Sequence, residues 1–569
     1  MPYTSPVADI RFLLDNVLGY DRLAETETFA EAGADVTEAI LGELGKLCDG
    51  VLAPLNRNGD LTPAKLENGV VRTSPGFKDG YKAIAEGGWL GIAATPEHGG
   101  MGLPQTLNTA MNEMMSGANL ALQLCPLLSQ GQIEALEHHA SDVLKDLYLP
   151  KLISGEWTGT MNLTEPQAGS DVGALRTKAE DNGDGSYSIT GQKIFITWGD
   201  HDVAENVCHL VLARLPDAAP GTKGISLFMV PKLIPDADGN PGARNELRVV
   251  SLEHKLGIHG SPTCVMAFEG ATGWMVGKPN GGMAAMFTMM NNARLGVGAQ
   301  GIGVAEAAYQ HALAYAQERK QGKTPLGEGT IIDHADVRRM LAVMKAEVFA
   351  ARAIALDCGL AIDMGKATGK DSWKARAALL TPIAKAHGTD IGCEVSSMGV
   401  QVHGGMGFIE ETGAAQYFRD ARITPIYEGT NGIQAMDLVA RKMMDGGEAA
   451  FRLLQEVQDN AEAARGSLPA LAESVWEASE TLRETTEWLV GQEMNDRFAG
   501  AVAYLRAFAR VLGAHYHLKA AMADPEGARA RLARVFMERI LPEHSSLLVQ
   551  AKAGAAQLYD LSAEDLLSA

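Results

Sequence analysis

The sequence predicts an α+β fold in which an N-terminal helical domain precedes an antiparallel β-barrel or sandwich, a helical bundle and an extra helical extension. Apolar residues recur at three- and four-residue spacing on both sides of the centre of the 569-residue chain. Between these helical parts, short β-rich runs follow one another with turn signals and no intervening helix. We therefore place the four domains at residues 1–155, 156–275, 276–445 and 446–569.

The composition is that of a globular protein and excludes several classes of function. The hydrophobic fraction is 46% and the charged fraction 21%, so the chain has enough apolar residues for a large core. A formal net charge of −21, with no run of five basic residues, argues against partners such as nucleic acid and anionic membranes. The six cysteines are scattered without a CxxC pair, so neither a disulfide framework nor a metal site is expected. The N-terminus lacks a basic leader and no run of 18 apolar residues occurs, which makes the cytoplasm the expected location.

The first two domains differ in their hydrophobic period. Helical spacing marks residues 37–52 and 107–124 in the first domain. In the second, the cluster Asp181-Asn182-Gly183-Asp184-Gly185 is a strong turn signal. The β-rich runs on either side of such turns lie at residues 187–190, 193–197, 207–212 and 225–230.

Long helices return after residue 280. We expect them at residues 283–320, 334–359 and 374–402, and in the extension at 468–494 and 498–522. Each glycine inside a helix costs up to ~1 kcal/mol relative to alanine. Another element must therefore approach the first of these helices closely, because it contains Gly296, Gly298, Gly301 and Gly303.

The segment around Glu428 is the most informative for chemistry. Pro425 ends any preceding helix and Gly429 loosens the following turn, so Glu428 lies in a break after large apolar side chains. Burial raises the pKa of a carboxyl group above ~4.3, and such a group can act as a general base. The alternative is a surface glutamate near a helix start, stabilised by the helix dipole. No GxGxxG motif follows a strand and opens a helix, so a Rossmann nucleotide site is not supported.

The run Ile426-Tyr427-Glu428-Gly429-Thr430 closely resembles the signature of the acyl-CoA dehydrogenases, and the motifs HGGMG, 161–178 and 255–263 resemble the same family. The resemblance covers about residues 80–440. It implies an FAD-dependent α,β-dehydrogenation of an acyl-CoA thioester to a trans-2-enoyl-CoA, with Glu428 removing the α-proton. Some members carry their base at the position of Ala293, which has no ionisable group here, so Glu428 is the only candidate.

The flavin ring is assigned to the central domain by the same resemblance. Leu163 and Thr164 would bond the flavin pyrimidine through backbone and hydroxyl groups, and Met161 lies in the same loop. Phe195 and Thr197 match the strand that backs the flavin, where the family often has Trp in place of Phe195. Without the family these residues would be interpreted as an ordinary turn, a core phenylalanine and a sheet threonine.

The rest of the FAD is assigned to the bundle. Arg319 matches an arginine that pairs with the pyrophosphate, a role that suits a planar, multidentate cation. Gln401, Gly404 and Gly405 match a loop that approaches the adenosine, and Thr430 completes the cofactor set. In the family, Arg319 and the Gln401 loop serve the FAD of the neighbouring subunit. Taken alone, Arg319 is an arginine at a helix end, and such residues are usually solvated.

Five residues are assigned to the substrate. Ser170 would contact the CoA moiety, and Arg294 matches an arginine at the start of a helix that lines the site. The resemblance also implies that the backbone N–H of Glu428 and a flavin ribityl hydroxyl hold the thioester oxygen. The remaining expected substrate contacts are Asn291, Tyr427 and Gly429.

Three segments of the chain indicate a particular subfamily. The N-terminal segment, the 255–263 variant and the C-terminal extension are similar to the bacterial subfamily that includes the 3-methylmercaptopropionyl-CoA dehydrogenases of dimethylsulfoniopropionate breakdown. Medium- and long-chain acyl-CoA dehydrogenases and an acyl-CoA oxidase are alternatives on the same fold. A DNA-binding adaptive-response flavoprotein would need a basic C-terminal surface, whereas this one is acidic. The expected partners are an acyl-CoA, an electron-transfer flavoprotein and a second copy of the chain, because longer members carry an added helical domain and remain homodimers.

Overall fold

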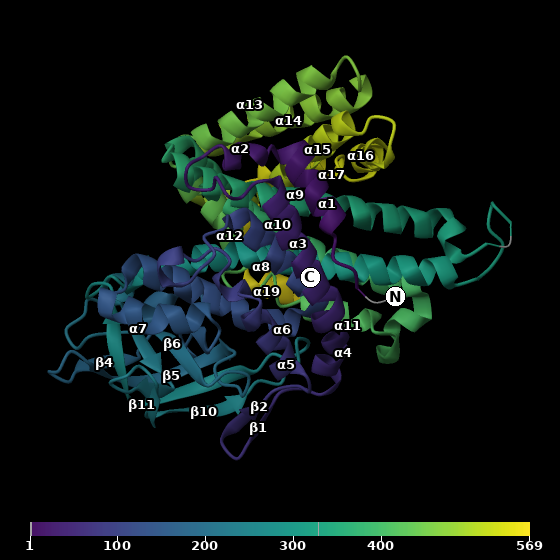
Figure 1. Ribbon diagram of the computed structural model, residues 1–569. Coiled ribbons are helices and arrows are strands. Elements are labelled where there is room, and N and C mark those ends of the chain that lie inside the picture. Colours follow the sequence, from purple (N-terminus) through teal and green to yellow (C-terminus); the bar gives the residue numbers. More distant parts are fainter. Residues whose placement is uncertain (1–2, 328, 569) are drawn as a thin grey trace.

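The computed structural model describes residues 3–327 and 329–568 and has the predicted order of helices, sheet, helices and extension (Figure 1). The N-terminal part holds a long central helix and six shorter ones. Their bounds are α1 (Val7–Leu13), α2 (Asp21–Ala24), α3 (Ala34–Leu47), α4 (Ala53–Leu61), α5 (Phe77–Glu86), α6 (Gln105–His139) and α7 (Asp142–Ile153).

A small hairpin in the N-terminal part was not predicted. Strands β1 (Lys65–Glu67) and β2 (Val70–Arg72) pair antiparallel on either side of Asn68 and Gly69. Both turn residues have positive φ angles, 51° and 76°. An Asn-Gly pair is the common solution for a two-residue hairpin turn, so the signal was present in the sequence.

The central sheet has the strand order β3-β6-β7-β11-β5-β4, and β10 pairs with β11 beside this path. The long β11 pairs first with β10 and β5 and then, at its end, with β7, so it joins two parts of the sheet. Strands β3 and β4 form the ends of the path, which does not close into a barrel among the described residues. The bounds are β3 (Trp157–Asn162), β4 (Lys178–Asp181), β5 (Tyr187–Thr197), β6 (Asn206–Ala213), β7 (Ser226–Pro231), β10 (Leu247–Leu252) and β11 (Thr263–Val276), with β8 (Leu233–Pro235) and β9 (Pro241–Arg244) forming a separate pair.

The expectation of purely antiparallel pairing was wrong at one edge, where β3 and β6 are parallel. Two strands and a loop intervene between them in the sequence, and such a connection allows a parallel neighbour. The two β-rich runs at 187–190 and 193–197 also form one strand, β5, which continues through Gly191.

The third part is a bundle of long helices: α8 (Gly282–Glu318), α9 (Ala335–Thr368) and α10 (Asp371–His403), followed by the short α11 (Ala414–Ala421) and α12 (Asn431–Val439). Helix α8 is the centre of this bundle and contacts α10, α6 and α9. A Cβ atom at Gly298 would lie 2.7 Å from the carbonyl oxygen of Ala384, and one at Gly301 would lie 2.3 Å from that of Gly388. The predicted close approach is therefore confirmed: the glycines let the backbones of α8 and α10 meet.

A buried ionic cluster joins distant parts of the sequence. The fully buried Arg352 of α9 donates to Glu113 of α6 and to Glu306 of α8, both at 2.7 Å. Asp9 of α1 lies 3.4 Å from Arg352 and 2.6 Å from Arg529 in the extension. Because a buried charge is costly without partners, this cluster requires all five helices to be in place.

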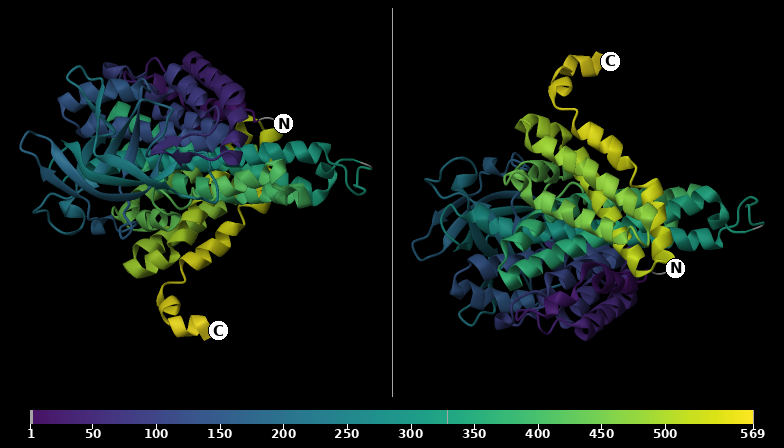
Figure 2. Two further views of the ribbon diagram at one scale, coloured as in Figure 1. Left: turned by 90° about the horizontal axis from the view of Figure 1, so that it is seen from below. Right: turned by 90° about the horizontal axis from the view of Figure 1, so that it is seen from above.

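The extension packs on the bundle. Helix α15 lies against α12, α9 and α10, and its Arg510 forms a buried pair with Glu347 of α9 at 2.6 Å. Figure 2 shows that the final residues, with α18 and α19, project from the body, and residues 556–568 are exposed. The bounds are α13 (Glu448–Ala464), α14 (Pro469–Val490), α15 (Met494–Ala523), α16 (Ala528–Arg539), α17 (Glu543–Ala551), α18 (Ala556–Tyr559) and α19 (Ala563–Ser568).

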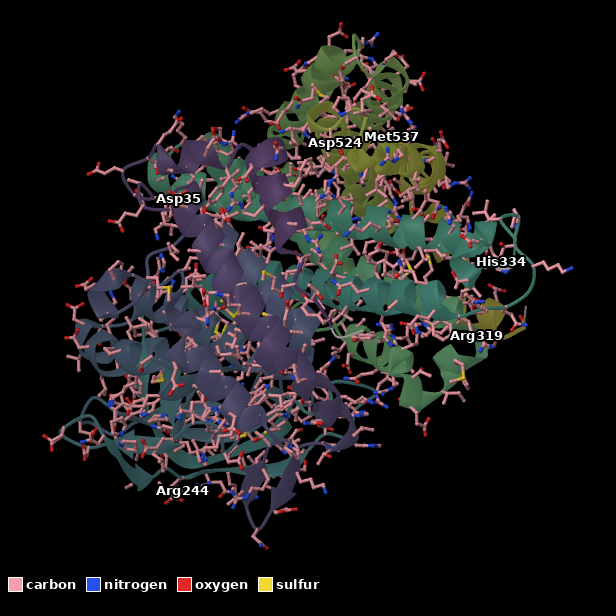
Figure 3. All side chains as sticks on the ribbon, turned by 45° about the vertical axis from the view of Figure 1, so that its right-hand side comes forward. Asp35, Arg244, Arg319, His334, Asp524 and Met537 are labelled. Carbon is pink, nitrogen blue, oxygen red and sulfur yellow. The ribbon has the colours of Figure 1, made fainter. Side chains whose placement is uncertain are left out.

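The hairpin of α8 and α9 extends beyond the body on the side away from the sheet. Figure 3 places Arg319 and His334 at its tip, while Arg244 lies at the far edge of the β region. In the described part of the chain, no helix is long and apolar enough to cross a membrane, and no cluster of side chains suits a metal ion.

We predict that Gly301→Ala lowers the free energy of unfolding. Alanine favours a helix by up to ~1 kcal/mol, but overpacking against a backbone oxygen costs typically ~1–3 kcal/mol. The matched control is Gly42→Ala in α3, where a Cβ atom would meet nothing within 4 Å, so this variant should be stabilised. Chemical denaturation of both variants with bound cofactor checks the opposite signs, and equal effects would contradict the close helix contact.

Candidate active site

The predicted base lies in a loop with a strained backbone. Glu428 has a φ angle of 54° and Gly429 one of 87°, between the end of α11 and the start of α12. A left-handed conformation is unfavourable for a glutamate, and it persists where the surrounding structure imposes it. In residues 3–327 and 329–568, no group donates a hydrogen bond to the Glu428 carboxylate and no acceptor takes its backbone N–H.

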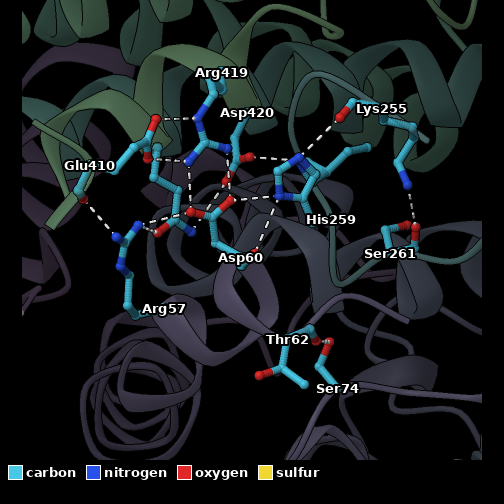
Figure 4. Close-up of polar contacts among 12 residues, drawn as sticks. Arg57, Asp60, Thr62, Ser74, Lys255, His259, Ser261, Glu410, Arg419 and Asp420 are labelled. Atoms are coloured by element: carbon cyan, nitrogen blue, oxygen red, sulfur yellow. Dashed lines mark hydrogen bonds and ion pairs between the residues drawn. The ribbon is translucent and has the colours of Figure 1, made fainter. Parts of the chain in front are cut away.

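An ionic cluster around Asp60 anchors the chain just before this loop (Figure 4). Arg419 makes a two-pronged contact with Asp60 at 2.7 and 2.6 Å, and His259 approaches the same carboxylate at 2.9 Å. Asp420 accepts from the backbone N–H of Ile258 at 2.5 Å. Arg419 and Asp420 belong to the motif that carries Glu428, but their role in fixing α11 against α4 and the 254–262 loop was not predicted.

Two cations act on Glu428 electrostatically. Burial raises the pKa of its carboxyl group to about 7, although Lys385 of α10 and Arg294 of α8 lower it. Glu428 as a whole residue is half-buried. The raised pKa agrees with the expectation for a carboxyl group in apolar surroundings, and it suits a base that works near neutral pH.

Tyr427 contributes mainly to packing. Its hydroxyl donates to Oε1 of Gln300 at 2.5 Å, and the Gln300 amide donates to Gln123 of α6 at 2.8 Å. The assignment of Tyr427 to the substrate stays a prediction; the structure shows that its hydroxyl is engaged with α8. The effect is to tie the loop to the centre of the bundle.

Arg294 lies within α8, not at its start, so that part of the expectation was wrong: α8 begins twelve residues earlier, at Gly282. Its side chain is 5% exposed, and Nη1 lies 3.8 Å from Asp437 and 3.5 Å from the side chain of Asn291. The Nε atom has no partner among the described residues. Burial lowers the pKa of Arg294, yet the group stays charged and faces Glu428.

Met161 is buried near the end of strand β3 and not in the loop, where it was expected; the loop after β3 carries Leu163 and Thr164, which are half-buried. Glu165 shapes this loop, a role that was not predicted. It pairs with the buried Lys193 at 2.8 Å and accepts from the backbone N–H of Arg176 and Thr177. Burial opposes the charge, but Lys193 and these hydrogen bonds lower the pKa of Glu165 to about 2. Lys193 also bonds the Leu163 carbonyl at 3.0 Å, which joins the loop to β5.

The face of β5 suits a planar ring. Phe195 is 58% exposed and has a φ angle of 60°, both unusual for a large aromatic residue in a strand. Thr197, half-buried, lies two residues further and pairs with Thr263 of β11. The backbone N–H of Ile194 donates to the Thr164 carbonyl at 2.9 Å, so loop and strand form one surface. An exposed aromatic beside a polar loop fits the predicted flavin residues.

The other predicted cofactor residues lie on the bundle. Arg319 is exposed at the tip of the α8–α9 hairpin (Figure 3). Gln401, Gly404 and Gly405 are exposed at the end of α10, and nothing lies within 4 Å of a Cβ atom at either glycine, so a ligand has room to approach. Thr430 caps α12 and accepts from the N–H of Ile433 at 3.3 Å, a structural task beside its predicted one.

Ser170 is exposed in the loop that follows Glu165. Three residues further along the chain, Gly173 lines a hollow of about 730 Å³, together with Arg176, Lys178, Arg214 and Gly221 among others. This hollow is on the β region and does not include Glu428. Its rim carries three basic side chains and one acidic one, Glu180, so it favours an anionic group.

Models of known families match nearly the whole chain. They are the acyl-CoA dehydrogenase N-terminal domain (residues 63–156), its middle domain (160–271) and its C-terminal domain (280–444), and the acetyl-CoA dehydrogenase C-terminal-like domain (453–562). The last of these covers the extension.

Among individual proteins, the chain is 42% identical to the 3-methylmercaptopropionyl-CoA dehydrogenase of Ruegeria pomeroyi over 100% of both chains. It is 38% identical to a butyryl-CoA dehydrogenase of Syntrophomonas wolfei, over 80% of this chain and 78% of that one. A solved acyl-CoA dehydrogenase of Bacillus anthracis in complex with FAD shares the fold, with a TM-score of 0.77 and 20% identity, covering 98% of this chain and 94% of the other.

Proposed function

The chain belongs to the acyl-CoA dehydrogenase family, and from this premise we propose that its substrate is 3-methylmercaptopropionyl-CoA, an intermediate of dimethylsulfoniopropionate breakdown. It is an FAD-dependent enzyme that forms a double bond between the α- and β-carbons of an acyl-CoA thioester. The observation that carries the proposed substrate is the 42% identity over the full length of both chains, extension included.

Glu428 is the proposed base. It takes the α-proton onto its carboxylate, which its raised pKa and its freedom from hydrogen bonds support. Its backbone N–H, which has no acceptor in the described residues, would donate to the thioester oxygen and stabilise the charge that develops there. Bound FAD supplies the acceptor for the hydride that leaves the β-carbon. Arg294 and Lys385 favour the carboxylate form of the base before proton transfer.

The proposed cofactor site spans two subunits. Phe195, Thr197 and Thr164 would hold the flavin on the β region. Arg319 lies at the tip of the distant hairpin (Figure 3), and Gln401 lies at the end of α10. A second copy of the chain would bring its hairpin to the first copy's flavin. Helix α15 covers α12 and part of the bundle, the surface on which the shorter members of the family build tetramers, so we propose a homodimer.

The proposal also covers the CoA part of the substrate, the electron acceptor and a second candidate substrate. The hollow that Gly173 lines, with its basic rim, is a suitable place for the phosphates of CoA. The electrons would pass on to an electron-transfer flavoprotein. A butyryl-CoA dehydrogenase is also a close relative, so a short straight-chain acyl-CoA is the second candidate substrate.

The substrate proposal predicts the highest kcat/KM for 3-methylmercaptopropionyl-CoA in a panel that also holds butyryl-, octanoyl- and palmitoyl-CoA. Such ratios report differential stabilisation of the transition state. Turnover with a dye acceptor and with oxygen should be compared, because rapid reoxidation by oxygen would indicate an oxidase. A preference of tenfold or more for octanoyl-CoA would contradict the proposed substrate.

Glu428→Gln should fold, retain FAD and lose ~10²–10⁴-fold in kcat, because the general base is removed. In the unaltered enzyme, kcat/KM should rise with pH through about 7, since the base acts only when its carboxyl group is deprotonated. The matched control is Glu411→Gln, an exposed glutamate near the same loop, with activity unchanged. Activity of Glu428→Gln within threefold of the unaltered enzyme would end the assignment.

Arg319→Ala should lose FAD on dialysis while the protein stays a homodimer of about 120 kDa, twice the 60.4 kDa chain. Loss of the guanidinium removes charge-assisted bonds to a pyrophosphate but no hydrogen bond or ion pair among the residues that the structure describes. Flavin absorbance and light scattering measure the two effects, with Arg339→Ala, an exposed arginine on the same hairpin, as the control. Full flavin occupancy of Arg319→Ala would contradict the role of Arg319 in FAD binding. A stable tetramer would contradict the homodimer.

A further inference from the structure

Lys385 is a buried lysine in the middle of α10, with no exposed side-chain surface. Its ammonium group donates to the carbonyl oxygen of Thr424 at 3.0 Å and to Oδ1 of Asn431 at 2.9 Å. Thr424 stands at the beginning of the loop that carries Glu428, and Asn431 is the first residue of α12 at its end. One ammonium group therefore joins both ends of the loop.

Asn431 extends this attachment. Its amide donates to the carbonyl of Ala386 at 3.2 Å, to Thr389 at 3.0 Å and to the carboxylate of Asp390 at 2.7 Å, all on α10. Its backbone N–H donates to the carbonyl of Pro425 at 3.0 Å and closes the loop on itself. The loop is thus attached to two turns of α10 through residues that flank Glu428, while the carboxylate stays unbonded.

The attachment matters because Glu428 itself has little to hold it. Its left-handed backbone is unfavourable for a residue with a side chain. Released from α10, the loop would relax towards an ordinary conformation, and the carboxylate and its backbone N–H would both move. A displacement of the base by about 1 Å costs on the order of 10²-fold in rate.

A buried lysine needs hydrogen-bond acceptors in any protein, so a purely structural role is the alternative. Two observations favour a role in positioning the base as well. Lys385 bonds residues on both sides of the base, at Thr424 and Asn431, and its charge lowers the pKa of Glu428. The other charged or titratable groups that act on Lys385 are Asp390 and Cys393 of α10 and Arg294 of α8, and burial lowers the pKa of Lys385 itself to about 7.

We infer that Lys385 is a positioning residue of this enzyme, which holds the two ends of the loop at Thr424 and Asn431 and so places Glu428 for proton abstraction. The inference rests on the proposed role of Glu428 as the base. Its contribution is separate from packing, because it combines a geometric constraint with a charge that Glu428 experiences.

Lys385→Met tests both parts, since methionine fills much of the same space without the ammonium group. With FAD bound, kcat should fall ~10–100-fold, while KM for the acyl-CoA should change less than threefold. The acid limb of kcat/KM should move to higher pH, because the lost cation no longer favours the carboxylate. The control is Thr381→Val, one turn earlier on α10, whose hydroxyl bonds within the helix and to Cys358.

Asn431→Ala is the second variant and keeps the lysine. It removes one anchor of the loop but not the charge, so kcat should fall with little change in the pH profile. If Lys385→Met does not fold, Asn431→Ala still tests whether the attachment of the loop positions Glu428. A folded Lys385→Met with unchanged kcat and pH profile would overturn the inference, as would full activity of Asn431→Ala. If Glu428→Gln itself remained active, the proposed base would fail first, which separates the two results.

Discussion

The close contact of α8 with α10 is the constraint on which the proposed active site depends. A Cβ atom at Gly298 would lie 2.7 Å from the carbonyl of Ala384 and 3.3 Å from Cα of Lys385, so only glycine permits this approach. Arg294 is one helical turn before Gly298, and Lys385 follows Ala384. The contact therefore sets the two cations that act on Glu428 at the same level of the bundle, and the loop between α11 and α12 meets both.

The extension is part of this arrangement and not an appendage to it. Helix α12 begins directly after the base loop and packs on α15 of the extension. Arg510 of α15 pairs with Glu347 in the bundle, and Arg529 of α16 pairs with Asp9 at the other end of the chain. Since these charges are buried or partly buried, separating the extension would leave them unpaired, at a considerable cost in stability. The family model for the extension, which matches residues 453–562, agrees with a standard element of the longer members.

In the β region, some residues stabilise the loop after β3 and a neighbouring residue is available to the cofactor. Glu165 and Lys193 are buried and hold the loop after β3 against β5, whereas Phe195 is exposed on that strand with a left-handed backbone. The burial of the pair lets the aromatic residue remain at the surface, where a ring can stack on it. The arginine proposed for the pyrophosphate lies far away on the α8–α9 hairpin, which explains why a single subunit has only part of the proposed FAD site.

The sequence alone determined the order of helices and sheet and the family, and it predicted Glu428 as the base, because period, composition and short motifs are local properties. It also predicted that some element must meet the glycines of α8. Only the tertiary structure decided which element this is, that β3 and β6 run parallel and that the Tyr427 hydroxyl bonds Gln300. The roles of Asp60, Glu165 and Lys385 came from the structure as well. Each acts through partners that lie far away in the sequence, such as Lys193 for Glu165, Arg419 for Asp60 and Thr424 for Lys385. The role of a buried charged residue can be recognised only when its partners are known, and the spacing of residues in the sequence does not show which residues these are.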